Sequence, residues 1–237
     1  MNAVRVGVWP AAVTSAAALD VLAHSLGKPA ARAAVRFGGV AALLGIARMA
    51  GVSWAGLGLG RGELRSGLRT GVLAGGCAVV VFAGVALPAT RGFFADERAT
   101  RAAAGGGLAL EVARITFVAV PPEELTYRSA LLGLRLGNGS RAGAVAWSSV
   151  LFGLSHIQPT LATMSQTAAG QHLAHRPLRQ AAFVAGNVAA TGAAGAVFAW
   201  LRLRSGSVLA PLLAHAALND SALIAGRLAH RLSRDRG

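Results

Sequence analysis

The hydrophobic positions of this chain are gathered in long runs, and the polar positions fall mainly between them. Most runs are about 18–22 residues long, which is the length that a helix needs to cross the hydrocarbon core of a bilayer. We therefore predict an all-α fold, a polytopic membrane helical bundle with about seven transmembrane helices. The predicted spans are residues 4–26, 33–51, 68–88, 104–122, 142–157, 180–201 and 207–227.

Three local features qualify this pattern. The fourth span is expected to continue as a helix to Leu134, although Pro121 and Pro122 should kink it or start a new helix. The longest polar connection is predicted over residues 158–179, and a frayed basic tail at the C-terminus. The first run resembles a signal peptide, but it stays apolar to about Leu26, which favours an uncleaved first span.

The composition agrees with a membrane protein. Of the 237 residues, 54% are hydrophobic and 14% are charged, whereas a soluble domain carries roughly 25% charged residues. The net charge of +14 comes from arginines that are spread through short loops and not gathered on one face, as nucleic-acid binding would require. Membrane lipids are therefore the expected partners of the arginines, and no nucleic acid is expected. The two sides of the membrane would receive nearly equal numbers of basic residues, so charge does not predict the topology.

An adjacent pair of carboxylates, Glu123 and Glu124, lies in an apolar stretch that ends with Arg128. Charged side chains are costly to keep inside a membrane and therefore mark functional sites. On a helix Glu124 and Arg128 are four residues apart and share a face, so they can form an ion pair. Glu123 lies about 100° away around the same helix. We expect Arg128 to hold Glu124 while Glu123 faces a cavity as a base.

Two later apolar segments carry histidines. Phe152 and His156 are four residues apart, and so are His215 and Asn219. An unpaired imidazole and an unpaired amide would both be costly in lipid. We therefore expect the three polar segments to meet in one buried site.

Two kinds of chemistry fit these residues. Glu123, His156 and His215 could hold a Zn²⁺ ion that activates water. Alternatively, Glu123 and His156 could polarise a water directly, with His215 and Asn219 donating hydrogen bonds to an oxyanion. Both routes hydrolyse an acyl bond, most naturally a peptide bond near the membrane surface. The HExxH motif of soluble zinc proteases is absent.

The motifs Glu-Glu-x-x-x-Arg (123–128), Phe-x-x-x-His (152–156) and His-x-x-x-Asn (215–219) occur in this order on separate apolar segments. In this they resemble the CPBP family of intramembrane proteases, which includes the CAAX prenyl endopeptidases and many bacterial relatives of the Abi type. The resemblance covers about residues 105–225.

The resemblance implies a role for each motif position. The catalytic residues that it implies are Glu123, His156, His215 and Asn219. The supporting residues that it implies are Glu124, Arg128 and Phe152. Glu123 would activate the water, and His156 would be a second water-activating group or a metal ligand. The resemblance leaves the metal-dependent and the glutamate-based mechanisms both open.

The function expected from the motifs and the resemblance is that of an intramembrane endopeptidase. It would cleave a membrane-associated protein or peptide from within a bacterial plasma membrane. Residues 1–103 would form N-terminal transmembrane helices, residues 104–228 the catalytic membrane core, and residues 229–237 a basic tail.

Two other classes of protein remain open. One is a non-enzymatic membrane immunity or binding protein that retains the protease fold. The other is a transporter that uses the Glu/His cluster as a proton relay. Transporters usually contain internal repeats, and the motifs of the second half have no counterpart before residue 100.

Two residues of the first hundred also stand out. Asp20 lies in the first span, four residues before His24, and the two are expected to form a hydrogen bond of structural importance. Cys77 is the single cysteine of the chain and is expected to be a small packing or lipid-facing residue.

Overall fold

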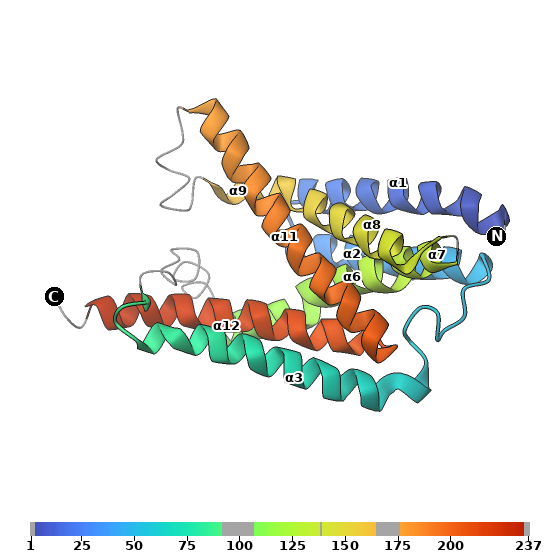
Figure 1. The fold of residues 1–237 in the computed structure, drawn as a ribbon. Helices are drawn as coiled ribbons and strands as arrows, with labels where there is room; N and C mark the ends of the chain where they lie inside the picture. Colours follow the sequence, from blue (N-terminus) through green and yellow to red (C-terminus); the bar gives the residue numbers. More distant parts are fainter. Residues whose placement is uncertain (1–2, 92–106, 138, 165–175, 235–237) are drawn as a thin grey trace.

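The computed structural model describes residues 3–91, 107–137, 139–164 and 176–234, and all of its regular elements are helical (Figure 1). The long helices are α1 (Ala3–Ser25), α2 (Pro29–Met49), α3 (Leu64–Ala83), α8 (Arg141–Ser155), α11 (Pro177–Ser205) and α12 (Leu209–Arg234). The shorter ones are α5 (Leu108–Arg114), α6 (Val120–Glu124), α7 (Leu132–Leu136) and α9 (Ile157–Met164). The all-α prediction is therefore confirmed within the described residues.

Three of the helical stretches are long and apolar enough to cross a membrane, namely Pro29–Met49, Arg61–Ala86 and Pro177–Ser205. Their outward faces carry large apolar side chains: 74% of Val80 is exposed, and 86% of Leu178. Large apolar side chains exposed in this way are unfavourable in water and favourable against lipid tails. The backbone polar groups of a helix are already hydrogen-bonded within the helix and therefore need no water there.

The fourth predicted span is one helical stretch from Leu108 to Leu136, as expected, but its helix type changes along its length. Residues Ile115–Ala119 and Leu125–Leu131 are π-helical, and α6 lies between them. Pro121 and Pro122 stand in the first turn of α6. Proline lacks an N–H group and its ring clashes with the carbonyl one turn before it. The wider π-helical turn that precedes the two prolines accommodates both effects.

Two segments are more helical than the sequence suggested. Residues 158–164, expected to belong to a polar connection, are part of α9, and Thr160 of α9 is hydrogen-bonded by the Asn187 amide of α11. The expected frayed tail is helical as far as Arg234, where α12 ends. Its last turns are held by Arg91, which donates a hydrogen bond to the Leu232 carbonyl at 3.3 Å.

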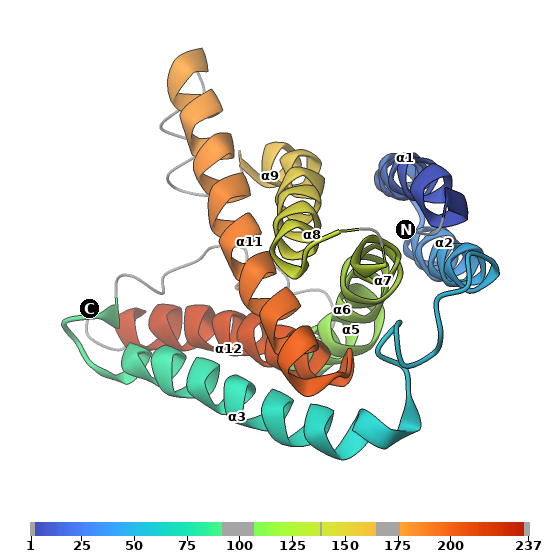
Figure 2. The same cartoon turned by 45° about the vertical axis from the view of Figure 1, so that its right-hand side comes forward.

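The helices pack in neighbouring pairs, with α1 beside α2, α3 beside α12 and α8 beside α11 (Figures 1 and 2). Figure 2 shows α1, α2, α6, α7 and α8 nearly end-on, while α3 and α12 lie across the view. The α5–α7 stretch lies between α2 and α12, and its middle therefore reaches both halves of the protein. The α3–α12 pair positions α12, the helix that contains the third motif.

The contact between α3 and α12 depends on a row of glycines one turn apart, Gly67, Gly71 and Gly75. A Cβ atom added to Gly67 would lie 2.6 Å from the Cβ of Ser207, and one added to Gly71 would lie 2.9 Å from the Cβ of Leu213. Small residues at such spacing let two helix backbones approach closely, which is the main source of packing energy between helices in lipid.

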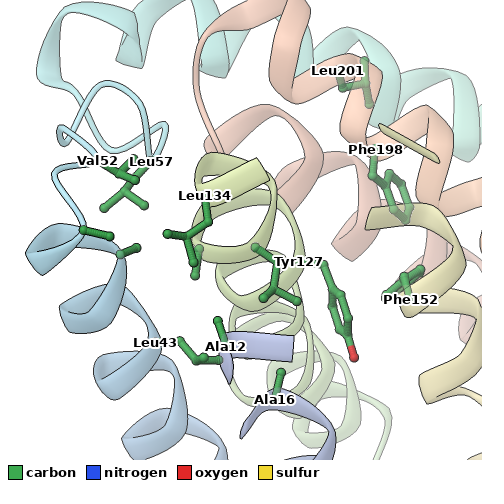
Figure 3. Packing of buried hydrophobic residues seen from close by; sticks show 14 of the residues in the cluster. Ala12, Ala16, Leu43, Val52, Leu57, Tyr127, Leu134, Phe152, Phe198 and Leu201 are labelled. Atoms are coloured by element: carbon green, nitrogen blue, oxygen red, sulfur yellow. The ribbon is translucent and has the colours of Figure 1, made fainter. Parts of the chain in front are cut away.

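The buried apolar core joins the N-terminal helices to the segment that carries the glutamates (Figure 3). Ala12, Ala16 and Leu43 of α1 and α2 pack against Tyr127 of the second π-helical segment. On its other side the ring of Tyr127 meets Phe152 edge to face, with the ring centroids 5.3 Å apart. Tyr127 therefore lies between the core and the polar motifs described below.

We predict that Gly71→Leu destabilises the protein by about 1–3 kcal/mol, because the added side chain forces α3 away from α12. Thermal unfolding in detergent micelles measures the effect. Gly76→Leu is the matched control, because it lies on the same helix, is exposed and has open space around it. Equal melting temperatures for the two variants would contradict this role of the glycine row.

Candidate active site

The carboxylate of Glu124 is fully buried and contacts two side chains, the guanidinium group of Arg128 and the imidazole of His215 from α12. Arg128 Nη1 lies 3.3 Å from Glu124 Oε1, and both side chains are completely buried. The Nδ1 atom of His215, on α12, lies 2.8 Å from the same oxygen. The ion pair between Glu124 and Arg128 is as the sequence predicted. The contact with His215 joins the first and the third motif across 91 positions of the chain.

Aromatic rings enclose the guanidinium group of Arg128. Its central carbon lies 3.9 Å from the centroid of Phe152, 5.3 Å from that of Phe198 and 5.8 Å from that of Tyr127. A cation held against ring faces away from water gains more from this attraction than an exposed one. Gly195 on α11 makes the packing possible, because a Cβ atom there would lie 3.0 Å from both Arg128 and Phe152.

Part of this buried cluster remains without hydrogen-bond partners. Oε2 of Glu124 and the guanidinium nitrogens of Arg128 have none within the described residues, although Nη1 is in ion-pair range of Oε1. Buried charged groups that are only partly satisfied are costly. They persist mainly where the polar group has a function, which makes the cluster a candidate functional site.

The ring of His215 is fixed on three sides. It stacks on Phe198, with a centroid distance of 4.7 Å and an interplanar angle of 22°, and it meets Phe152 edge to face. A carboxylate oxygen can only accept, so the Nδ1–H group of His215 donates to Glu124. The Nε2 atom is therefore left for other partners. Asn219 follows one turn later on α12 and is half-buried.

His156 is fixed in the same tautomer by a different partner. It directly follows α8 as the C-cap residue, and its Nδ1–H group donates to the carbonyl oxygen of Phe152 at 2.8 Å. Its ring lies 4.7 Å from the ring of Phe152, edge to face. The hydrogen bond that orients the His156 ring thus leaves its Nε2 atom free, as in His215. The ring of Phe152 contacts the rings of both histidines.

Glu123 is arranged differently from its neighbour Glu124. Its side chain is half-buried, and it lines a small cavity together with Asp20, Arg36 and Tyr127. Its carboxylate receives no hydrogen bond from the described part of the chain, whereas Glu124 is held in place. The geometry thus agrees with the predicted division between a held Glu124 and a cavity-facing Glu123.

Asp20 is the residue of this region whose position the sequence did not indicate. It forms the expected pair with His24, with Nδ1 and Oδ1 3.4 Å apart. It also lines the cavity of Glu123 and a second cavity of about 350 Å³, which Leu154, Ser155 and Gln158 line as well. The available signal was an aspartate within an apolar run, the same signal that singled out the glutamate pair.

The zinc set considered above, Glu123, His156 and His215, does not fit the geometry. Within the described residues no group of three or more His, Cys, Asp or Glu side chains is placed to hold a metal ion. The hydrogen bonds of the two histidines to Phe152 and Glu124 use only their Nδ1 atoms and leave the Nε2 atoms free, so the misfit lies in the placement of the three side chains and not in occupied ring nitrogens.

The fold and the site together define an integral membrane protein with a polar cluster buried among its helices. A family model described as type II CAAX prenyl endopeptidase Rce1-like matches residues 105–220, which contain all three motifs. Residues 105–220, just under half of the chain, belong to this Rce1-like family of CAAX prenyl endopeptidases. Comparison with curated proteins and with solved structures found no match.

We predict that Arg128→Met destabilises the protein by about 3–5 kcal/mol, because it leaves the buried carboxylate of Glu124 without its cation. Combining it with Glu124→Gln should recover part of the loss. Chemical unfolding of the single and double variants in micelles measures this coupling.

The matched control is Arg114→Met, since Arg114 forms an ion pair with Glu111 at 2.8 Å on the same helical stretch but has a largely exposed side chain. Its expected cost is about 0–1 kcal/mol. An equally small cost for Arg128→Met would show that the buried ion pair does not hold this site together.

Proposed function

We propose that this protein is an intramembrane endopeptidase that cleaves a peptide bond of a membrane-associated protein or peptide. The observation that carries the proposal is the separation of the two adjacent glutamates. Glu124 is locked to Arg128 and His215, and Glu123 keeps its carboxylate free at a cavity. The catalytic core would be residues 104–228, which contain every residue assigned a role below.

Glu123 is the proposed general base. Its carboxylate takes a proton from a water molecule as the water oxygen attacks the carbonyl carbon of the peptide bond. The Nε2 atom of His156 accepts the second hydrogen bond of that water and orients it, since the Nδ1–H group is held by Phe152. The protonated Glu123 then gives its proton to the leaving nitrogen, the C–N bond breaks, and a carboxylic acid and an amine are formed.

His215 and Asn219 are proposed to stabilise the oxyanion of the tetrahedral intermediate. His215 donates its Nδ1–H group to Glu124, so an Nε2–H group is present in its doubly protonated form. That Nε2–H group and the Asn219 amide would then both donate to the oxyanion. Arg128 supplies the countercharge to the Glu124 carboxylate in its apolar surroundings.

The transmembrane arrangement follows from the order of the helices. Successive segments, α1, α2, α3, the α5–α7 stretch, α8 with α9, α11 and α12, run in alternating directions (Figure 1). We propose that all seven segments cross the bilayer, four more than the three helices that are long and apolar enough by themselves. We also propose that the membrane is a bacterial plasma membrane. A substrate would then reach Glu123 from the side of α1 and α2, whose residues line its cavity.

We predict that Glu123→Gln lowers the cleavage rate by about 10²–10⁴-fold, because the amide cannot take the proton from water. New N-termini of membrane proteins, mapped by mass spectrometry in cells producing either form, identify the substrates. Purified protein and quenched peptides based on these sites then give the rates.

Glu111→Gln is the control for this substitution, because Glu111 lies on the same helical stretch and forms an exposed ion pair. It should cleave at the wild-type rate. If the wild type creates no N-terminus that the Glu123→Gln form lacks, the protein is not a hydrolase acting through Glu123. The non-enzymatic membrane protein would then be the better description.

We also predict that dialysis against a strong chelator leaves the cleavage rate unchanged and that added Zn²⁺ does not raise it. The reason is that, within the described residues, no three His, Cys, Asp or Glu side chains are grouped so as to hold a metal ion. The comparison uses the peptide and the wild-type protein of the preceding experiment. Activity that is lost with the chelator and restored by Zn²⁺ would overturn the glutamate-based route.

A further inference from the structure

A further cavity, of about 840 Å³, is lined by residues of α3 and α11 and by none of the motif residues. Three arginines line it, Arg65 and Arg69 of α3 and Arg204 of α11. None of the three takes part in an ion pair with an acidic residue within the described part of the chain. Each has an exposed side chain, and Arg204 lies against the ring of Trp200, 5.5 Å from its centroid.

The lining of this cavity changes from cationic to apolar along its length. On α3 the residues Arg65, Arg69, Leu73 and Cys77 follow each other at intervals of one turn and so lie on one face. The distance from the first to the last along the helix axis is about 18 Å. Leu201 adds a further apolar side chain from α11.

The cationic end lies where a lipid headgroup would be. α3 begins and α11 ends at the same end of the protein (Figure 1). The turn after α11 touches the residue before α3, since a Cβ atom added to Gly206 would lie 2.7 Å from Glu63 Cγ. Both helices are long and apolar enough to cross a membrane. The arginines therefore stand at the membrane surface, at a helix end, and the apolar end of the cavity faces the hydrocarbon core.

We propose that this cavity, which we name the α3–α11 groove, is a binding site for one anionic glycerophospholipid. The arginines would bind its phosphate, because a guanidinium group donates two parallel hydrogen bonds to phosphate oxygens. Ser66 and Thr70 supply hydroxyl groups at the same level for the glycerol and headgroup oxygens. An acyl chain would lie along Leu73 and cover Cys77. Basic pockets between membrane helices bind anionic lipids in this way.

The charge of the groove favours an anionic lipid over a zwitterionic one. A zwitterionic headgroup contains a cation that three adjacent arginines would repel, whereas phosphatidylglycerol contains only the negative phosphate. Each basic residue near an anionic headgroup adds to the attraction. Removal of all three arginines should therefore weaken binding by about 100-fold, because the binding free energies lost with the three residues add up and together correspond to an affinity ratio of this size.

The single cysteine of the chain provides the measurement. Cys77 is free, exposed and part of the apolar end of the groove. In micelles of a zwitterionic phosphocholine detergent, with no lipid in the groove, its thiol should react with the membrane-permeant reagent N-ethylmaleimide at a measurable rate. Added phosphatidylglycerol should slow the reaction by about tenfold or more at saturation, since an acyl chain then covers the thiol. Inorganic phosphate should leave the rate unchanged, because it binds the arginines without an acyl chain.

The variant Arg65→Gln/Arg69→Gln/Arg204→Gln should lose the protection, and the corresponding triple lysine variant should keep most of it. The matched control is Arg141→Gln/Arg176→Gln/Arg179→Gln, which removes the same charge from exposed arginines that do not line the groove. Circular dichroism and melting temperature check the fold of each variant.

Equal reaction rates with and without phosphatidylglycerol in the wild type would overturn the proposal. Full protection in the groove variant, or its loss in the control variant, would show that general surface charge and not this groove binds the lipid. Protection by inorganic phosphate alone would point to an ion site without a lipid. Native mass spectrometry should agree, with one phosphatidylglycerol retained per wild-type molecule.

Discussion

The burial of one carboxylate is the constraint on which the rest of this structure depends. Glu124 has no exposed surface, and an ionised carboxylate in such a place must have a cation and hydrogen-bond donors close by. Arg128 supplies the cation and His215 the donor. Because these partners come from two helices that are far apart in the sequence, this single group ties α12 to the α5–α7 stretch.

The surrounding packing can be understood as support for that cluster. Phe152 and Phe198 cover Arg128, and Phe198 also stacks on His215, so α8 and α11 are both needed to enclose it. The glycines of α3 hold α12 from the other side, and Thr116 donates a hydrogen bond to Asp220 of α12 at 2.7 Å. The helix type around Glu124 changes to π on both sides, which is common where a helix must present functional groups.

Much of the fold was predictable because a membrane imposes a simple relation between sequence and structure. Apolar runs of spanning length give the helices, and charged residues within them give the site, so Glu124 could be paired with Arg128 from spacing alone.

The sequence did not indicate that Glu124 rather than Glu123 would bond to His215. Nor did it indicate that Asp20 would lie at the cavity of Glu123. Both depend on how helices distant in the sequence are packed, and a spacing rule within one helix carries no information about that. The helix α9 was missed because its stability comes from contacts such as Thr160 with Asn187 and not from a long apolar run.

The central claim is that Glu123, the carboxylate left outside the buried cluster, activates water and does not itself attack the substrate. A single turnover in H₂¹⁸O, with enzyme in excess over a peptide substrate, tests this directly. The account predicts ¹⁸O in the new carboxyl group of the peptide and none in the side chain of Glu123, as read by mass spectrometry of both products. Incorporation of ¹⁸O into Glu123 would contradict it, because that result requires a covalent anhydride between Glu123 and the substrate.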